Sequence, residues 1–287
     1  MSLTGWTNLN LLWHPAHARQ TPGKRQRVRR LLDDVMALTL VPSTQTFWRG
    51  LSRASYRLTP SVLHSGNGAV LGSAAEIEDH GDRLVADAVS ARHVWRDGVS
   101  LRGLLDLETL ALLQHFRTRT PLLDLTADPL VSLYFAARAH DDEDGVLIGW
   151  NAVDWLELTN KPDSYKKVVQ NLTTSRQLGW LIPPVVTDRV VVQRSRMLVA
   201  PVDPQADHWA KAVSDFLLPE LPPDWNQAKL ARLFSTTGAG RRAMPPALAI
   251  KVPKGLKPFI RDVLSHSFGI DGVTMFPDAA GYGQEHS

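Results

Sequence analysis

The chain contains no cysteine among its 287 residues. Structural disulfides, thiolate catalysis and zinc sites with cysteine ligands are therefore excluded. No stretch approaches the roughly 18 uninterrupted apolar residues of a membrane-spanning helix, and the N-terminal residues lack the charged region and apolar run of a signal peptide. These absences predict a protein of the cytoplasm that does not enter a membrane.

A strong charge of either sign is also missing. The 32 Lys and Arg residues nearly balance the 29 Asp and Glu residues, which leaves a net charge of +3. So small an excess indicates no general preference for nucleic acid. A globular chain of this length folds as one large domain or as two small ones.

The common enzyme signatures are absent as well. The sequence has no G-x-x-x-x-G-K-[ST] phosphate loop, no H-E-x-x-H metal motif and no G-x-S-x-G nucleophile elbow. His14 and His17 are three residues apart, but their segment contains Pro15, so they do not match the metal-ligand spacing of a helix. We therefore expect no metal site.

Helices are predicted where capping residues precede apolar residues at helical spacing. The clearest start is Asp128-Pro129, because Asp caps a helix well and Pro at the first helical position gives up a donor that would be unpaired. Ser73 and Glu76 form a capping box for another helix. Further helices are expected over residues 23–39, after Asp106, and over residues 258–267, where Gly269 ends the last one.

Runs rich in Val, Ile and Leu predict strands at residues 46–50, 145–151, 189–193, 197–202 and 247–252. Helices interleaved with short strands predict an α+β fold, in which small mixed sheets pack with helices.

The predicted helix over residues 23–39 is amphipathic and basic. One face carries apolar residues at i, i+3 and i+4 spacing, and the other carries Arg25, Arg27, Arg29 and Arg30. Two interpretations stay open: the arginines form a solvated face, or they contact an anionic partner such as nucleic acid. The later pair Arg241-Arg242 favours the second interpretation. We assign residues 1–40 to an N-terminal extension that contains this helix.

Three blocks of residues stand out along the chain. The first is Phe47-Trp48-Arg49-Gly50, followed by Leu58-Thr59-Pro60-Ser61. The second begins with Gln114-His115-Phe116 and continues through the run from Thr120 to Leu130 to Leu133-Tyr134-Phe135-Ala136-Ala137. The third is Met275-Phe276-Pro277-Asp278-Ala279-Ala280-Gly281. In this order the blocks resemble the FRG domain, which is named after its Phe-Arg-Gly motif. The resemblance covers about residues 40–281, and we assign residues 41–287 to an FRG domain.

Three positions depart from the family pattern. Arg117 stands where a glycine usually follows the aromatic residue, Pro121 stands where an arginine is usual, and Leu125 replaces an aromatic residue. Arg119 is a candidate to replace the missing guanidinium. Any family role of an arginine at position 121 is therefore open.

The block order is more distantly similar to ADP-ribosyltransferases, which implies an ADP-ribosyltransferase-like fold and NAD as a substrate. In that comparison Arg49 would hold the ribose or phosphate through paired hydrogen bonds, and Gly50 would let NAD approach the backbone. Thr126 would end the middle strand, and nicotinamide would stack near Tyr134 and Phe135. The late catalytic position falls on Gln193, in the strand predicted over residues 189–193, where the amide would orient a ribose hydroxyl.

His115 and Asp124 complete the candidate catalytic set. The candidates also have structural interpretations: Arg49 could pair with Asp124, His115 could compensate a helix end, Gln193 could be a polar residue of a strand, and Tyr134 and Phe135 could belong to the core.

Three classes of function remain open. FRG domains often lie beside toxin and phage-defence genes, which implies a toxin, toxin–antitoxin or phage-defence effector. Such an effector would transfer ADP-ribose from NAD to a macromolecular acceptor or hydrolyse NAD. A second class is a non-catalytic module that binds nucleic acid or a protein partner such as an antitoxin. A metal-independent nuclease that uses Arg49, His115 and Asp124 is the third.

Overall fold

The computed structural model describes residues 23–39, 45–53, 56, 60–63, 74–90, 103–175, 177–185, 187–201 and 247–277. Several features predicted above lie outside these ranges, namely those at His14, His17, Leu58, Thr59, Ser73, Arg241, Arg242 and residues 278–281. The chain divides into two compact units. Unit 1 holds the described residues up to 56 together with 126–153 and 247–277, and unit 2 holds those from 60 to 125 and from 154 to 201.

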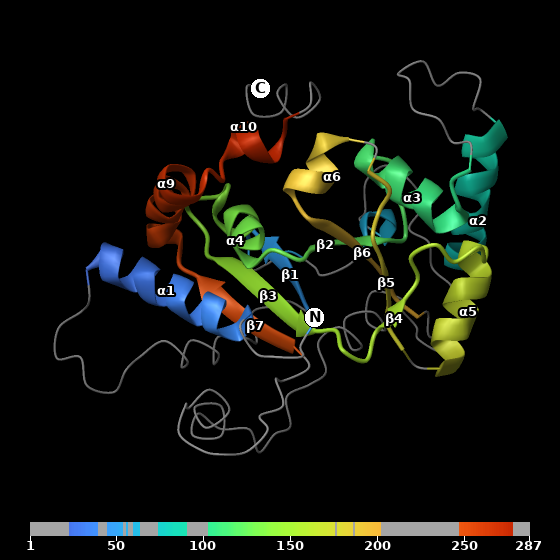
Figure 1. Cartoon of the computed structure of the whole chain (residues 1–287), viewed down its shortest axis with the longest axis horizontal. Coiled ribbons are helices and arrows are strands. Elements are labelled where there is room, and N and C mark those ends of the chain that lie inside the picture. Colours follow the sequence, from blue (N-terminus) through green and yellow to red (C-terminus); the bar gives the residue numbers. More distant parts are fainter. Residues whose placement is uncertain are drawn as a thin grey trace. The chain divides into compact units, whose positions relative to one another are not determined.

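Unit 1 contains three antiparallel strands, β1 (Thr46–Leu51), β3 (Gly145–Asn151) and β7 (Ala247–Val252). Strand β3 lies between the other two and pairs with both along its length (Figure 1). Six of its seven residues are buried, as expected for a central strand. A further strand, β2 (Leu123–Thr126), meets β1 antiparallel where Thr126 pairs with Trp48. The strands predicted at residues 46–50, 145–151 and 247–252 are therefore confirmed.

The helices of unit 1 are α1 (Lys24–Thr39), α4 (Pro129–Ala137), α9 (Lys257–Phe268) and the short α10 (Gly272–Met275), and a 3-10 turn, η3 (Lys254–Leu256), precedes α9. Helix α4 packs on β1, β3 and α9, and α1 contacts both α4 and α9. Asp128 caps α4 as predicted, because its Oδ1 accepts hydrogen bonds from the backbone N–H groups of Leu130 (2.9 Å) and Val131 (3.4 Å). Gly269 ends α9 in the left-handed conformation, also as predicted.

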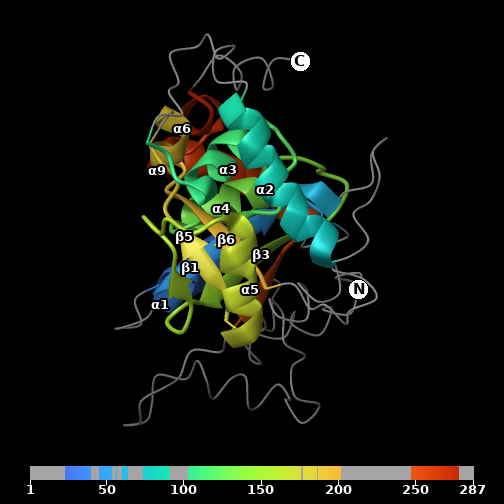
Figure 2. The ribbon, with the colours of Figure 1, turned by 90° about the vertical axis from the view of Figure 1, so that its right-hand side faces the viewer.

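Unit 2 contains η2 (Ser61–Leu63), the helices α2 (Ala74–Ser90), α3 (Asp106–His115), α5 (Tyr165–Ser175) and α6 (Asp188–Val192), and the strands β4 (Leu156–Glu157), β5 (Gly179–Leu181) and β6 (Ser195–Val199). Strand β5 pairs in parallel with β4 and antiparallel with β6. Helix α2 packs against both α3 and α5 (Figure 2). At the second contact Gly81 of α2 lies against the ring of Tyr165, so closely that a Cβ atom there would overlap the ring.

The fold is α+β, with parallel and antiparallel strand pairs packed with helices, as predicted. The strand predicted at residues 189–193 is wrong, because these residues form α6 and its C-terminal cap. Three consecutive valines favour a strand, but propensity is easily overridden by context in so short a segment. Here the N–H of Gln193 donates to the carbonyl of Arg189 (3.0 Å), which closes a helical turn, and the turn buries Val190 while Val191 faces solvent.

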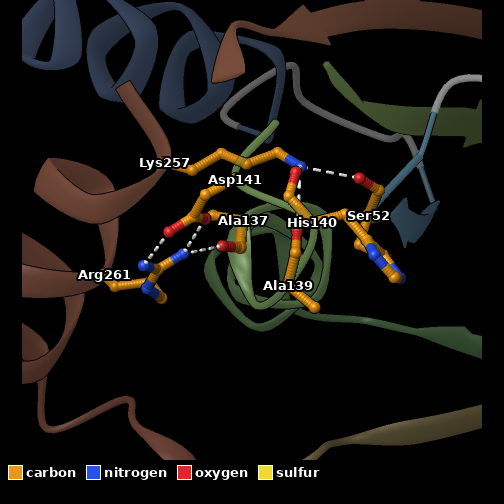
Figure 3. Close-up of polar contacts among 7 residues, drawn as sticks. All are labelled: Ser52, Ala137, Ala139, His140, Asp141, Lys257 and Arg261. Carbon is orange, nitrogen blue, oxygen red and sulfur yellow. Dashed lines mark hydrogen bonds and ion pairs between the residues drawn. The ribbon is translucent and has the colours of Figure 1, made fainter. Parts of the chain in front are cut away.

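A buried lysine joins the ends of β1, α4 and α9. The Lys257 side chain is 0% exposed, and its Nζ donates to the carbonyl oxygens of Ser52 (2.7 Å), Ala139 (2.9 Å) and His140 (2.7 Å) (Figure 3). One turn further along α9, Arg261 donates to the carbonyl of Ala137 (2.7 Å). Two cations thus satisfy carbonyls that the end of α4 leaves without helical partners.

The charges around this cluster act in opposite directions. Burial lowers the pKa of Lys257, and the carboxylates of Asp141 and Asp144 oppose this effect. Arg261 forms a two-pronged ion pair with Asp141, with N–O distances of 2.6 and 2.7 Å, and this hydrogen bonding lowers the pKa of Asp141. The ion pair with Arg261 thus favours the charged carboxylate of Asp141, whereas burial opposes the charged form of Lys257.

We predict that Lys257→Met strongly destabilises the protein. Methionine preserves most of the side-chain length but leaves three carbonyls without their donor, and each unsatisfied buried group costs about 1–3 kcal/mol. The expected loss in the free energy of unfolding is at least about 3 kcal/mol, measured by urea denaturation with tryptophan fluorescence.

The matched control is Lys254→Met, three residues earlier. Lys254 is exposed, and its Nζ donates only to the carbonyl of Asp142 (3.1 Å). Its loss should cost less than about 1 kcal/mol, as is usual for an exposed polar contact. Equal costs for the two variants would show that the buried ammonium group does not hold these elements together.

Candidate functional site

The Phe-Arg-Gly motif lies in β1, where most of its residues serve packing. Phe47 and Trp48 are buried. A Cβ atom added to Gly50 would overlap the carbonyl oxygen of Ser132 and lie 2.6 Å from the backbone nitrogen of Ala136. The backbone of α4 therefore fills the space beside Gly50. This differs from the expectation that Gly50 leaves room for NAD, because the glycine is needed for the contact between strand and helix.

Arg49 is half-buried and lies on the other face of β1. Side chains alternate along a strand, so Arg49 points away from the face that carries Trp48 and Gly50 and that packs against α4. Tyr134 and Phe135 belong to α4. The structure thus places the candidate phosphate-binding arginine and the candidate nicotinamide-stacking aromatics on opposite sides of β1.

Thr126 connects β2 to α4. It is buried, and its Oγ1 accepts a hydrogen bond from the N–H of Asp128 (2.9 Å), the residue that caps α4. Strand β2 thus ends at a small polar residue and leads into a helix with two aromatic residues. A cofactor role of Thr126 stays a prediction.

The aromatic residues of α4 meet the third sequence block. Tyr134 is buried, in agreement with its structural interpretation, and Phe135 is half-buried. The rings of Phe135 and Phe276 form an edge-to-face pair with centroids 6.0 Å apart, and the Arg138 guanidinium lies 4.4 Å from the centroid of Phe276. In unit 1, α4 therefore contacts both the first block, at Gly50, and the third, at Phe276.

A second junction of motif residues lies in unit 2, around the fully buried Thr120. Ser61 Oγ donates to the carbonyl of Thr120 (3.4 Å) and accepts from its N–H (3.2 Å). The hydroxyl of Thr120 donates to Oε1 of Gln114. Residues from three separate segments, the Pro-Ser, Gln-His and Thr-x-Leu-Leu-Asp segments, therefore meet at one threonine.

The remaining catalytic candidates lie in unit 2, in three different settings. His115 is the last residue of α3, and its Nε2 lies 2.6 Å from Oγ1 of Thr187, the residue before α6. Asp124 is exposed on β2. Gln193 caps the end of α6 instead of lying within a strand, so the strand position implied for it is corrected.

Two arginines in the left-handed conformation were not predicted. Arg117 has φ 67° and directly follows Phe116, the cap residue of α3, and Arg194 has φ 46° and directly follows Gln193, the cap residue of α6. The sequence contained one signal of this, because Arg117 stands where the family usually has glycine, the residue that adopts this conformation at least cost. Arg119, the candidate replacement for the missing guanidinium, is exposed.

Two kinds of feature are absent from the described residues. Within the ranges given above, no group of three or more His, Asp or Glu side chains is arranged to hold a metal ion. No helix in that part of the chain has the length and apolarity needed to cross a bilayer.

The fold and the motifs thus define an α+β protein in which the strand with the Phe-Arg-Gly motif packs against a capped, apolar helix. A family model of the FRG domain matches residues 44–145. The chain therefore contains an FRG domain, and the resemblance to that family is confirmed. No curated protein and no solved structure matched the chain. The matched residues begin after α1, and they end before Phe276.

We predict that Gly50→Ala is severely destabilising. The added methyl group would overlap backbone atoms of α4, which cannot turn aside as a side chain can. Overpacking of this kind costs about 1–3 kcal/mol and occasionally more, and the effect should be read from urea denaturation.

Gly255→Ala is the matched control, since a Cβ atom at Gly255 would meet nothing within 4 Å. We expect its stability to be unchanged or slightly raised, because alanine restricts the unfolded chain. A stable Gly50→Ala variant would mean that α4 does not rest on β1 at this point.

Proposed function

We propose that the protein binds nucleic acid through the basic face of α1, by contacts to phosphate groups. Val28, Leu31 and Val35 are buried and fix which side of the helix faces the rest of unit 1. Arg25 and Arg29 are exposed, as is Lys24 at the start of the helix. Residues 25 and 29 are four apart, so their guanidinium groups leave the same face of α1.

The position of these charges along α1 is the observation that carries the proposal. The first turn of α1 contains no acidic residue, and all five basic residues of the helix lie between positions 24 and 30. The N-terminus of a helix carries a partial positive charge, and cations there are unfavourable by a few tenths of a kcal/mol to about 1 kcal/mol each at low salt. A phosphate group bound at this end would reverse that cost, since it would interact favourably with both the arginines and the helix dipole.

Intramolecular pairing leaves the basic face available. Arg29 lies 3.9 Å from Asp33 in an i, i+4 pair, with side chains 82% and 69% exposed. Pairs as exposed as this one contribute little and are readily exchanged for other partners. Because the whole chain carries a net charge of only +3, binding should depend on this local cluster and not on long-range attraction.

We expect the purified protein to bind a short duplex DNA or single-stranded RNA without sequence preference, with an affinity that falls steeply between about 50 and 200 mM salt. The double variant Arg25→Gln/Arg29→Gln should weaken binding and reduce the slope of log K against log salt by about 2. Fluorescence anisotropy at several salt concentrations measures both quantities.

Arg83→Gln is the control, because Arg83 is also exposed on a helix but lies on α2 in unit 2. It should leave affinity and salt slope unchanged. An unaltered slope in the α1 variant, or an equal change in the control, would contradict the assignment of binding to α1.

A second candidate function is that of a toxin or phage-defence effector that uses NAD, either by transferring ADP-ribose to a macromolecule or by hydrolysing NAD. Two observations favour it: the strand-to-helix order from β2 through Thr126 into α4, and the half-buried Arg49 beside the fully buried Trp48. The guanidinium of Arg49, in unit 1, would bind a phosphate of NAD. Asp124, in unit 2, is a separate candidate for orienting a reacting hydroxyl. Gln193 is not included, because it does not lie in a strand.

Asp124→Asn tests this candidate with little risk to the fold. Asp124 is exposed, so the nearly isosteric change should lower the melting temperature only slightly. If Asp124 orients a reacting group, its loss should lower NAD consumption on the order of 100-fold, as followed by chromatography of NAD and nicotinamide. Arg49→Ala should likewise abolish consumption and relieve any growth defect that expression causes in bacteria. Absence of NAD consumption by the unmodified protein, with or without an added lysate, would eliminate the candidate.

A further inference from the structure

We propose that the side chain of Arg196 binds the phosphate group of a small organic phosphate, whose apolar part lies against Ile182. Arg196 belongs to β6, and Ile182 directly follows β5. Both residues lie in unit 2, whereas the nucleic-acid site proposed on α1 lies in unit 1. This phosphate site is therefore additional to the nucleic-acid site and independent of it.

The pairing of β5 with β6 places Arg196 and Ile182 side by side. Leu181 pairs with Met197 in this antiparallel ladder. The next step along the ladder brings Ile182 beside Arg196. Figures 1 and 2 both show the two strands next to each other. Residues opposite each other in a sheet carry their side chains on the same face, so Arg196 and Ile182 point to one side.

This side of β5 faces away from α5. A Cβ atom added to Gly179 would meet the side chain of Leu172, which belongs to α5, so Gly179 faces that helix. Side chains alternate along a strand, so Trp180 and Ile182 face the other way. Ile182 is 38% exposed. The side of β5 opposite to α5 therefore carries an accessible apolar side chain next to Arg196.

The guanidinium group of Arg196 is held in place by two contacts. Its Nη1 donates to the carbonyl of Ser195 (2.8 Å), and its Cζ lies 5.9 Å from the centroid of the Trp180 ring. Trp180 is only 5% exposed, so the arginine lies on a buried aromatic residue that cannot move aside easily. A guanidinium group with a fixed orientation is suited to paired hydrogen bonds with an oxyanion.

Most hydrogen-bond donors of Arg196 have no acceptor in the described part of the chain. A guanidinium group has several N–H donors, and of these Nη1 alone donates to a described residue. The Nε atom is buried and has no acceptor there. Arg196 also forms no ion pair with a carboxylate of the described residues. A half-buried cation without such a partner is unfavourable, and a bound anion would relieve that cost.

The charges near Arg196 also favour an anion. Burial lowers the pKa of Arg196, the positive charge of Arg194 lowers it further, and Glu157 acts in the opposite direction. Arg194 has contacts of its own within the fold, and its influence on Arg196 is that of its charge. Glu157 lies on β4 opposite Trp180 and is exposed. Its carboxylate therefore offsets only part of the positive charge around Arg196.

A small organic phosphate fits these features better than a carboxylate or a nucleic acid. A phosphate monoester carries more negative charge than a carboxylate and offers more acceptor oxygens to a guanidinium group. The exposed side chain of Ile182 adds an apolar contact beside the charge. Nucleic acid, by contrast, is bound through many cations along its backbone.

Isothermal titration calorimetry of the full-length protein tests the site with AMP, inorganic phosphate, acetate and a short duplex DNA. AMP should bind at least about tenfold more tightly than acetate, and inorganic phosphate should compete with it. Arg196→Gln should weaken AMP binding about tenfold or more, because the charge-assisted hydrogen bonds are lost. Arg196→Lys should weaken it less, since lysine keeps the charge but lacks the planar fork. Without ligand, both variants should melt at nearly the same temperature as the unmodified protein, because Arg196 has no ion pair to lose.

Arg83→Gln is the matched control, because Arg83 is also an arginine of unit 2 but is exposed on α2. It should leave the affinity for AMP unchanged. The proposal is overturned if AMP does not bind, if acetate binds equally well, or if Arg196→Gln lowers the melting temperature while AMP affinity stays the same. Arg196→Gln that weakens duplex binding as strongly as AMP binding would assign Arg196 to nucleic acid instead. Failure of the duplex to bind at all would contradict only the site on α1.

Discussion

The ammonium group of Lys257 lies buried in unit 1, and three carbonyl oxygens accept its three hydrogen bonds. Ser52 supplies one of them just after β1, and Ala139 and His140 supply the others just after α4. One side chain at the start of α9 therefore satisfies the ends of two elements that are distant in sequence. Because each of these carbonyls would be costly to leave unpaired, the position of α4 on β1 depends on this lysine. Gly50, two residues before Ser52, packs against the same helix.

Most residues that carry the family resemblance serve to join elements. In unit 1, α4 meets the first block at Gly50 and the third at Phe276. In unit 2, Thr120 bonds to Ser61 and Gln114. Buried contacts of this kind are explained by folding, because they satisfy polar groups or permit close packing. The motif is therefore weak support for any one chemistry, and the function must be sought in side chains that remain accessible.

The features that could be predicted from the sequence are those that depend only on residues close together in the chain. The cap at Asp128-Pro129, the left-handed Gly269 and the buried face of α1 follow from local rules, and all are present in the structure. The sequence did not predict α6, because the strand preference of consecutive valines was outweighed by tertiary context. Nor did it predict the burial of Lys257, since a lysine at the start of a helix ordinarily faces solvent. Contacts between distant segments decide both cases, and no local pattern encodes them.

The departures from the family pattern differ in what they imply. Pro121 is buried, whereas Arg119, the candidate replacement for the missing guanidinium, is exposed, so the two positions differ in their surroundings. Arg117 is different, because the backbone there adopts the conformation that suits the family's usual glycine, and both hydrogen bonds of the helix end form. The fold at this point thus accepts either residue, and arginine is the less favourable for stability. The family's usual glycine is therefore explained by the left-handed backbone that ends α3.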